Sequence, residues 1–131
     1  MKTLSLTLAL CALALPAVAQ DTTPAALIAG YEAAAGAKAD PAAGRDLFLA
    51  NHTGGKPDTP SCTTCHTNDP TKPGQARTGK AIDPLAPSAT PARFTDSAKV
   101  EKWFGRNCDS VLGRACTDAE KANLLAWLSS L

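Results

Sequence analysis

The 131-residue chain is poor in aromatic side chains and has no marked excess of either charge. Phe, Trp and Tyr make up 5% of it, and 13 Lys and Arg face 12 Asp and Glu. The sequence has no run of basic residues and no stripe of interleaved aromatics, which are the features of a nucleic-acid-binding surface. We therefore expect no nucleic acid among its partners.

The one long apolar run lies near the N-terminus, at residues 4–15. It follows a lysine and precedes an Ala-Val-Ala sequence, an order that is typical of a cleaved secretory leader. The run is shorter than the roughly 20 residues that a membrane-spanning helix needs, which disfavours a retained anchor. We predict that residues 1–19 are a cleaved signal peptide, that residues 20–131 form a single domain, and that the protein is periplasmic.

Cleavage would remove the only methionine of the chain, Met1, and one of its five cysteines, Cys11. The mature chain then has four cysteines and two histidines but no thioether that could ligate a metal. It carries 12 basic and 12 acidic side chains, because Lys2 leaves with the signal peptide. The charge of the chain therefore indicates no particular partner.

Two of the remaining cysteines belong to a C-x-x-C-H motif formed by Cys62, Cys65 and His66. This is the attachment signature of a c-type haem, in which two thiols add to the porphyrin vinyl groups and the His becomes the proximal iron ligand. A thioredoxin-like dithiol would need a βαβ frame, and a zinc site would need four suitably spaced ligands. Neither pattern is visible, so we predict one covalently bound haem c.

The rest of the pattern is helical and predicts an all-α fold. A Thr cap, a Pro at the first helical position and a Gly stop predict a helix over 23–36. An Asp-Pro start at residue 40 predicts a second helix, which carries Gly44 and Phe48. A third is expected over 96–105, and a capping box at 117–120 opens a terminal helix with Trp127.

A Gly-x-x-x-Phe helix before C-x-x-C-H, together with an aromatic residue on the terminal helix, resembles the crossed helix pair of class I cytochromes c. The matching positions are Gly44, Phe48 and Trp127. The resemblance implies that the Gly permits a close approach of two helix backbones. Residues 51–61 depart from the pattern, because this segment is longer than a minimal member would have, and its Gly and Pro content predicts a loop.

Residues 68–93 contain five prolines and two glycines and are predicted as a coil around the haem edge. In class I cytochromes a Pro carbonyl accepts the proton of the proximal His, so Pro70 or Pro73 is expected to orient His66. Three basic residues are candidates to pair with the haem propionates: Arg77, Lys80 and Arg93.

Cys108 and Cys116 are the two cysteines outside the motif. An exported protein matures in an oxidising compartment, where two thiols so close in sequence are expected to form a disulfide. On the chain-entropy model, closing so small a loop stabilises the fold by roughly 2 to 3 kcal/mol.

The residues alone leave the sixth iron position open among His52, Asn107, a lysine and no protein ligand. Imidazole is the usual partner of haem iron, and His52 is the second His, whereas a lysine would need a large pKa shift. In class I cytochromes, however, the distal ligand comes from the segment between the last two helices. That segment is predicted here as a loop over 106–116, and it offers Asn107 but no imidazole.

The residues from Trp103 to Cys108 and from Gly113 to Thr117 resemble those of the SHP-type oxygen-binding cytochromes c, and the resemblance runs through the mature chain. It implies that Asn107 ligates ferric haem and leaves on reduction, which opens the iron to O2, NO or CO. An amide oxygen is a hard, weak donor that suits ferric better than ferrous iron. The resemblance also suggests a diheme or membrane b-type cytochrome as redox partner.

We therefore expect an exported cytochrome that accepts electrons and binds small diatomic ligands when reduced. One alternative is a plain electron carrier with a permanent six-coordinate haem. The other is a reductase of oxygen or nitrogen oxides, so the sequence does not decide whether the protein is an enzyme.

Overall fold

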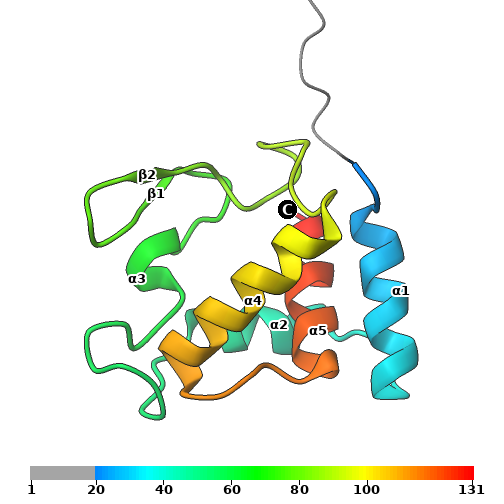
Figure 1. Ribbon diagram of the computed structural model, residues 1–131, viewed down its shortest axis with the longest axis horizontal. Helices are drawn as coiled ribbons and strands as arrows, with labels where there is room; N and C mark the ends of the chain where they lie inside the picture. The colour runs from blue at the N-terminus through cyan, green and yellow to red at the C-terminus, as the bar shows by residue number, and fades with distance from the viewer. Residues whose placement is uncertain (1–19) are drawn as a thin grey trace, which may run out of the picture.

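A computed structural model describes residues 20–131, and the signal peptide predicted over 1–19 lies outside the described residues. In this part of the chain the elements are helices α1 (Pro24–Ala35), α2 (Pro41–Leu49), α3 (Thr63–His66), α4 (Ser97–Leu112) and α5 (Asp118–Ser129), with strands β1 (Gly74–Gln75) and β2 (Ala81–Ile82) (Figure 1). The predicted all-α class is confirmed. Within residues 20–131, no helix combines the length and the apolar composition needed to cross a membrane.

The helix starts that the sequence predicts are present as capping hydrogen bonds. The Thr23 hydroxyl accepts from the backbone N–H of Ala26 at 3.1 Å, and the Asp40 carboxylate caps α2 in the same way. At α5 both bonds of the capping box are formed, one from the Glu120 N–H to the Thr117 hydroxyl at 3.2 Å and one from the Thr117 N–H to the Glu120 carboxylate at 2.8 Å. These side chains satisfy N–H groups that the first helical turn leaves without a partner.

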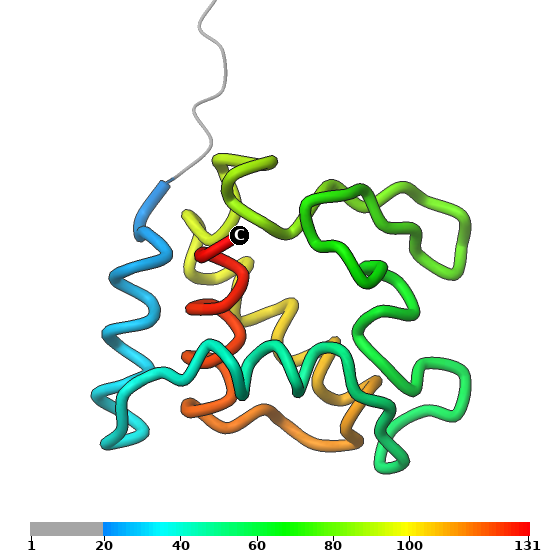
Figure 2. The backbone as a smooth tube through the Cα atoms, turned by 180° about the vertical axis from the view of Figure 1, so that it is seen from behind, coloured from blue at the N-terminus to red at the C-terminus, as the bar shows by residue number. Residues whose placement is uncertain are grey.

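Helix α2 crosses α5 at the predicted position, and α1 lies along the other side of α5 (Figure 2). A Cβ on Gly44 would overlap the backbone carbonyl of Asn123, so the two helix backbones come this close only because residue 44 has no side chain. One turn further along α2, the buried Phe48 ring packs on Trp127 with ring centroids 5.1 Å apart. The crossed helix pair that the Gly-x-x-x-Phe pattern indicates is therefore confirmed.

Helix α4 is longer than the sequence predicts, and this corrects the position of Asn107. The helix was expected to end at Gly105, with a loop over 106–116, but it continues to Leu112, so Asn107 lies on a helix and not in a loop. The physical reason is burial: Cys108 and Val111 continue the buried face that begins at Val100. The helix ends where Gly113 adopts a left-handed conformation, with φ of 69°.

The segment predicted as coil contains a small hairpin. Strands β1 and β2 pair antiparallel, with Gly74 opposite Ile82 and Gln75 opposite Ala81. Two residues per strand are too few to produce an alternating pattern in the sequence, so the prediction missed them. The hairpin and the coil after it form the side of the molecule that faces α3 and α4 (Figure 1).

Candidate functional site

A cavity of about 510 Å³ lies between the α2–α3 segment, the hairpin region, α4 and α5. Most of its wall is apolar and comes from residues such as Leu47, Phe48, Ile82, Leu85, Val100 and Leu128. The three residues of the C-x-x-C-H motif line it, and so do Asn107 and both remaining cysteines. The structure thus brings together in one cavity all six site residues that the sequence predicts.

The motif forms a single helical turn. The N–H groups of Cys65 and His66 both donate to the Cys62 carbonyl oxygen, at 3.3 and 3.1 Å. Residues three and four apart on a helix lie on one face, so this turn presents Cys62, Cys65 and His66 to the cavity together. Ser61, which is only 4% exposed, donates to the Phe48 carbonyl at 3.3 Å and so ties the motif to α2.

His66 is suited to be a neutral nitrogen ligand. Burial lowers the pKa of its imidazole to about 4, and the positive charge of Arg93 adds to this shift. The ring is therefore unprotonated at neutral pH and can offer a lone pair to a metal. Phe48 lies beside it, with ring centroids 6.3 Å apart. Burial likewise raises the pKa of the Cys62 thiol to about 11, so this sulfur is protonated at neutral pH.

Only some of the groups expected to orient His66 or to pair with the haem propionates line the cavity. The Pro70 carbonyl accepts from the backbone N–H groups of Leu85 and Ala86, at 2.9 and 3.0 Å. No hydrogen bond joins His66 to Pro70 or Pro73 among residues 20–131, so the orientation of the imidazole by either one stays a prediction. Of the three predicted basic residues, Lys80 and Arg93 line the cavity, and Arg77 pairs with Asp58.

Helix α4 supplies a second wall of the cavity. Val100, Trp103, Phe104 and Asn107 all line it, since positions three, four and seven residues apart share one helix face. Trp103 is 45% exposed, which is a large fraction for an indole on an apolar wall, and a flat apolar group in the cavity would cover it. The guanidinium of Arg106 lies over the Trp103 ring, 5.5 Å from its centroid.

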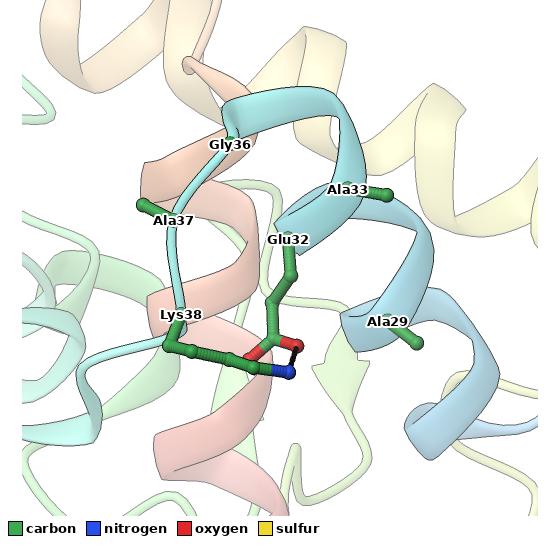
Figure 3. A pocket seen from close by; sticks show the side chains of 6 residues that line it. All are labelled: Ala29, Glu32, Ala33, Gly36, Ala37 and Lys38. Carbon is green, nitrogen blue, oxygen red and sulfur yellow. Dashed lines mark hydrogen bonds and ion pairs between the residues drawn. The ribbon is translucent and has the colours of Figure 1, made fainter.

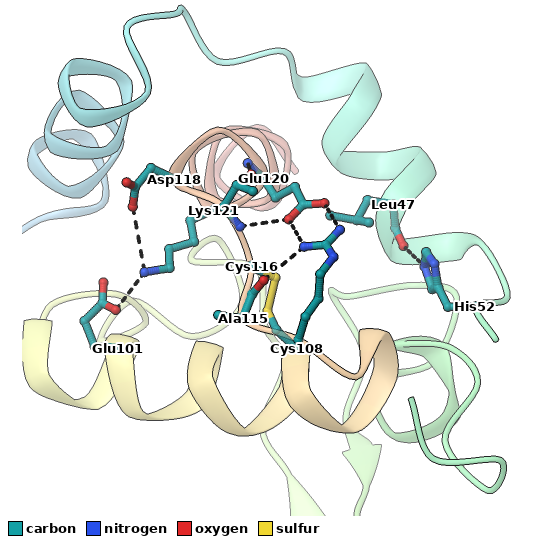
Figure 4. Close-up of a disulfide and its surroundings, with 11 residues drawn as sticks. Leu47, His52, Glu101, Cys108, Ala115, Cys116, Asp118, Glu120 and Lys121 are labelled. Atoms are coloured by element: carbon teal, nitrogen blue, oxygen red, sulfur yellow. Dashed lines mark hydrogen bonds and ion pairs between the residues drawn. A yellow bond between two sulfur atoms is a disulfide. The ribbon is translucent and has the colours of Figure 1, made fainter. Parts of the chain in front are cut away.

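The other sixth-ligand alternatives are placed differently. His52 is absent from the cavity wall, and its Nε2 atom is hydrogen-bonded to the Leu47 carbonyl at 2.9 Å (Figure 4). Two lysines, Lys80 and Lys99, do line the cavity. Asn107 is therefore the predicted candidate that combines a position on the cavity with an uncharged donor atom.

Cys108 and Cys116 lie at disulfide-bonding distance, with Cα atoms 5.5 Å apart, and Figure 4 shows the bond between α4 and the connection that leads into α5. The same connection is reinforced by Arg114, whose guanidinium donates two hydrogen bonds to the Glu120 carboxylate at 2.7 and 2.8 Å. Lys121 of α5 pairs with Glu101 of α4 at 2.9 Å. The disulfide thus ties the last turns of α4 to the connection before α5, Arg114 of that connection pairs with α5, and the Glu101–Lys121 pair joins the first half of α4 to α5.

Two polar residues on the cavity wall, Thr59 and Ser110, are not predicted from the sequence. Their hydroxyl oxygens are 2.8 Å apart, although the residues are 51 positions apart in the chain. A single Thr in a Gly- and Pro-bearing loop and a single Ser on a helix carry no motif. No signal in the sequence could have paired them.

A second hollow of about 370 Å³ lies on the surface where α1 ends (Figure 3). Its polar side chains, Glu32 and Lys38, pair with each other at 2.8 Å. None of the predicted site residues lines it, and we assign it no chemistry.

The residues on the main cavity fit a covalently attached haem. Two sulfurs and an uncharged imidazole project from one turn, apolar and aromatic walls surround them, and Arg93, which donates to the Pro84 and Asp83 carbonyls, adds a cation to the lining. The zinc alternative finds no ligand set in residues 20–131, where no three His, Cys, Asp or Glu side chains are grouped to hold an ion. The helical fold and this site together define a c-type cytochrome.

Comparisons with known proteins agree with this class. A family model described as "Domain of unknown function (DUF1924)" matches residues 34–128. The chain is 73% identical to the cytochrome c-type protein SHP of Cereibacter sphaeroides over 118 residues, which are 90% of this chain and 92% of that protein. It is 48% identical to cytochrome c'' of Methylophilus methylotrophus over 69 residues, or 52% of this chain and 48% of that protein.

Solved structures show the same relationship. Oxidised SHP, described as an oxygen binding cytochrome c, superimposes with a TM-score of 0.83 at 73% identity, over 85% of this chain and 99% of that one. Oxidised cytochrome c'' superimposes with a TM-score of 0.70 at 34% identity, over 82% and 93%. The chain belongs to the SHP family of c-type cytochromes, as the motif resemblance predicts, and membership of that family implies haem c as its cofactor.

Proposed function

We propose that this protein is an exported monohaem cytochrome that accepts an electron and then binds O2, with NO and CO as further ligands of the same position. One observation carries the proposal: a single cavity is lined both by the C-x-x-C-H turn and by Asn107. The description of the SHP relative as an oxygen binding cytochrome c supports the choice of O2. The bound haem supplies the iron and the reversible one-electron chemistry.

In this proposal Cys62 and Cys65 hold the group through thioether bonds, and His66 is the proximal ligand. The turn that contains them is anchored to α2 through Ser61, so the imidazole is held at a fixed position relative to the helical core. Its low pKa keeps Nδ1 or Nε2 available as a ligand throughout the physiological pH range.

Asn107 is the distal ligand in this proposal, through its amide oxygen. That oxygen is a hard and neutral donor, so it prefers ferric to ferrous iron and is released on reduction. A diatomic ligand then competes with a weak bond instead of a strong one. The freed Asn107 side chain also carries two N–H donors that can stabilise a bound diatomic by hydrogen bonding.

Substitution of Asn107 tests this assignment. Asn107→Val removes the donor at similar size, so the ferric form should change from low to high spin while the dithionite-reduced form still binds CO. Asn107→His should keep both states low-spin and suppress CO binding, because imidazole stays on ferrous iron. Absorption spectra with and without dithionite and CO distinguish the two variants.

The same spectra contain the outcome that would overturn the proposal. An unchanged ferric spectrum in Asn107→Val, or a native ferrous form that is low-spin and refuses CO, would leave a plain electron carrier with a permanent six-coordinate haem. Sustained consumption of O2 or a nitrogen oxide with a physiological donor would instead identify a reductase.

The electron supply and the location are part of the proposal. We infer a redox partner cytochrome, either diheme or membrane b-type, from the SHP resemblance. Export to the periplasm follows from the predicted signal peptide and agrees with a disulfide between Cys108 and Cys116. N-terminal sequencing of the protein from its native host should begin at Gln20, and a chain that begins at Met1 would contradict export by cleavage.

A further inference from the structure

The loop over 51–61, which is long for a class I cytochrome, packs against the last turn of α4. The loop is closed at its base by a hydrogen bond from the His52 N–H to the Pro60 carbonyl, at 2.7 Å. Its tip reaches Ser110, which lies one helical turn after Asn107. Two donors of the loop converge on the Ser110 carbonyl oxygen: the Lys56 backbone N–H at 2.7 Å and the Thr59 hydroxyl at 3.0 Å.

The approach of the loop to the helix is close enough to require glycine. A Cβ on Gly55 would overlap the Ser110 carbonyl oxygen and the backbone of Val111. The loop backbone therefore lies directly on the helix backbone, without intervening side chains. This contact involves the final turn of α4, so the loop and the disulfide at Cys108 both act on the same short stretch of helix.

The contact supplies hydrogen bonds that the end of a helix otherwise lacks. The last four carbonyl groups of an α-helix have no N–H partner within the helix, and Ser110 is among the last four residues of α4. In an α-helix the Asn107 carbonyl pairs with the N–H four residues later, which belongs to Val111 in that final turn. Fraying of the turn would therefore loosen the backbone of Asn107 itself.

The Thr59 hydroxyl lies between two oxygens of Ser110. It is 3.0 Å from the carbonyl oxygen, to which it can donate, and 2.8 Å from the hydroxyl oxygen, where either group can be the donor. Thr59 is only 8% exposed, so water competes little for these bonds.

We propose that Thr59 is a positioning residue for the distal ligand: through Ser110 it holds the last turn of α4 so that the Asn107 amide oxygen meets ferric iron. This inference rests on the proposed function of Asn107. The effect of Thr59 on the Asn107 bond is expected in the ferric state only, which distinguishes it from a general effect on the cavity. In the ferric state the loop strengthens a weak bond, whereas in the ferrous state Asn107 has left the iron and the loop contact has no bond to strengthen.

A competing ferric ligand measures the effect directly. If Asn107 blocks the iron, azide can bind only the protein molecules in which Asn107 is off the iron. The apparent azide affinity is then the intrinsic affinity multiplied by the fraction of such molecules. Thr59→Val removes the hydroxyl at nearly constant shape, and losing its hydrogen bonds should raise the azide affinity of the ferric holoprotein about fivefold to tenfold. CO affinity of the dithionite-reduced protein should stay within about twofold of wild type, and Thr59→Ser should restore the azide affinity.

Two further variants guard against an effect of general destabilisation. Thr23→Ala removes a threonine hydrogen bond from the N-cap of α1, which does not line the cavity, so it should lower the unfolding temperature without changing azide affinity. Ser110→Ala keeps the carbonyl acceptor but removes the hydroxyl, and it should raise azide affinity about twofold to threefold. If Thr59→Val does not fold with haem, Ser110→Ala decides the question.

Asn107→Val, measured in parallel, separates the two proposals. If it raises azide affinity strongly but Thr59→Val and Ser110→Ala do not, the positioning role of Thr59 is wrong and the ligand role of Asn107 stands. Equal changes in azide and CO affinity would also overturn the positioning role. If Asn107→Val leaves azide affinity unchanged, Asn107 is not the ferric ligand and both proposals fall.

Discussion

The Nε2 atom of His52 is hydrogen-bonded to the carbonyl oxygen of Leu47, 2.9 Å away, at the end of α2. The bond engages one of the two ring nitrogens of His52 in a contact with α2, and His52 does not line the haem cavity. The residue that chemistry alone would rank first as an iron ligand is therefore occupied in a structural contact.

We accordingly predict that His52→Ala leaves the ferric absorption spectrum unchanged. The substitution should cost about 1 kcal/mol of unfolding free energy, the usual contribution of one hydrogen bond. Absorption spectroscopy and denaturant unfolding of the holoprotein measure the two effects. A change from low to high spin on this substitution alone would make His52 the distal ligand.

Gly44→Ala should destabilise the fold strongly, because its Cβ would overlap the Asn123 carbonyl at the crossing of α2 and α5. We expect a loss of about 3 kcal/mol or more, since both partners are helix backbone and cannot move aside cheaply. Gly30→Ala is the matched control, as nothing lies within 4 Å of the new methyl group. It should stabilise α1 by about 0.5 to 1 kcal/mol, and equal effects of the two substitutions would contradict the close crossing.

Thioether attachment predicts a graded result for the two motif cysteines. Cys62→Ala or Cys65→Ala alone should leave haem bound covalently through one sulfur, and the double substitution should leave no covalent haem. Extraction of the denatured protein into acidified organic solvent measures the covalent fraction. Complete extraction of haem from the wild-type protein would end the c-type assignment.

The connection between α4 and α5 should weaken in acid. Two hydrogen bonds from Arg114 are the main cause that lowers the pKa of Glu120 from 4.5 to about 2. Because the folded pKa is depressed, this stabilisation is complete above pH 4.5 and is lost as pH falls toward 2. The pair is partly exposed, so the unfolding temperature should fall by about 2 to 5 °C more between pH 5 and pH 2.5 in wild type than in Glu120→Gln. Identical pH profiles would show that the pair contributes nothing.

Local signals in the sequence predicted most of the fold. Thr23, Asp40 and the Thr117–Glu120 box mark helix starts because their side chains bond to N–H groups two or three residues away, within the same short stretch of chain. The C-x-x-C-H turn is equally local. These features depend on neighbouring residues alone and can therefore be inferred without a structure.

The features that the sequence did not predict depend on distant contacts. Gly105 and Asn107 suggested the end of a helix, but burial of Cys108 and Val111 against the rest of the molecule extends α4 to Leu112. The bond between Thr59 and Ser110 joins residues 51 positions apart. Asn107 reaches the cavity wall from the extended α4, so the sequence alone indicated its identity as a candidate but not the helix that carries it.

The four cysteines of the described chain all line the same cavity, but two are free thiols and two form a disulfide. Cys62 and Cys65 are free thiols, as the proposed thioether attachment requires, whereas Cys108 and Cys116 pair with each other. The thiolate is the form that attacks a disulfide, and burial raises the pKa of the Cys62 thiol to about 11, so little of this nucleophile is present at neutral pH. The burial that shapes the cavity would therefore also slow exchange between the two cysteine pairs in the chain without haem. Thioether attachment, as proposed, would consume the sulfurs of Cys62 and Cys65 and end that exchange.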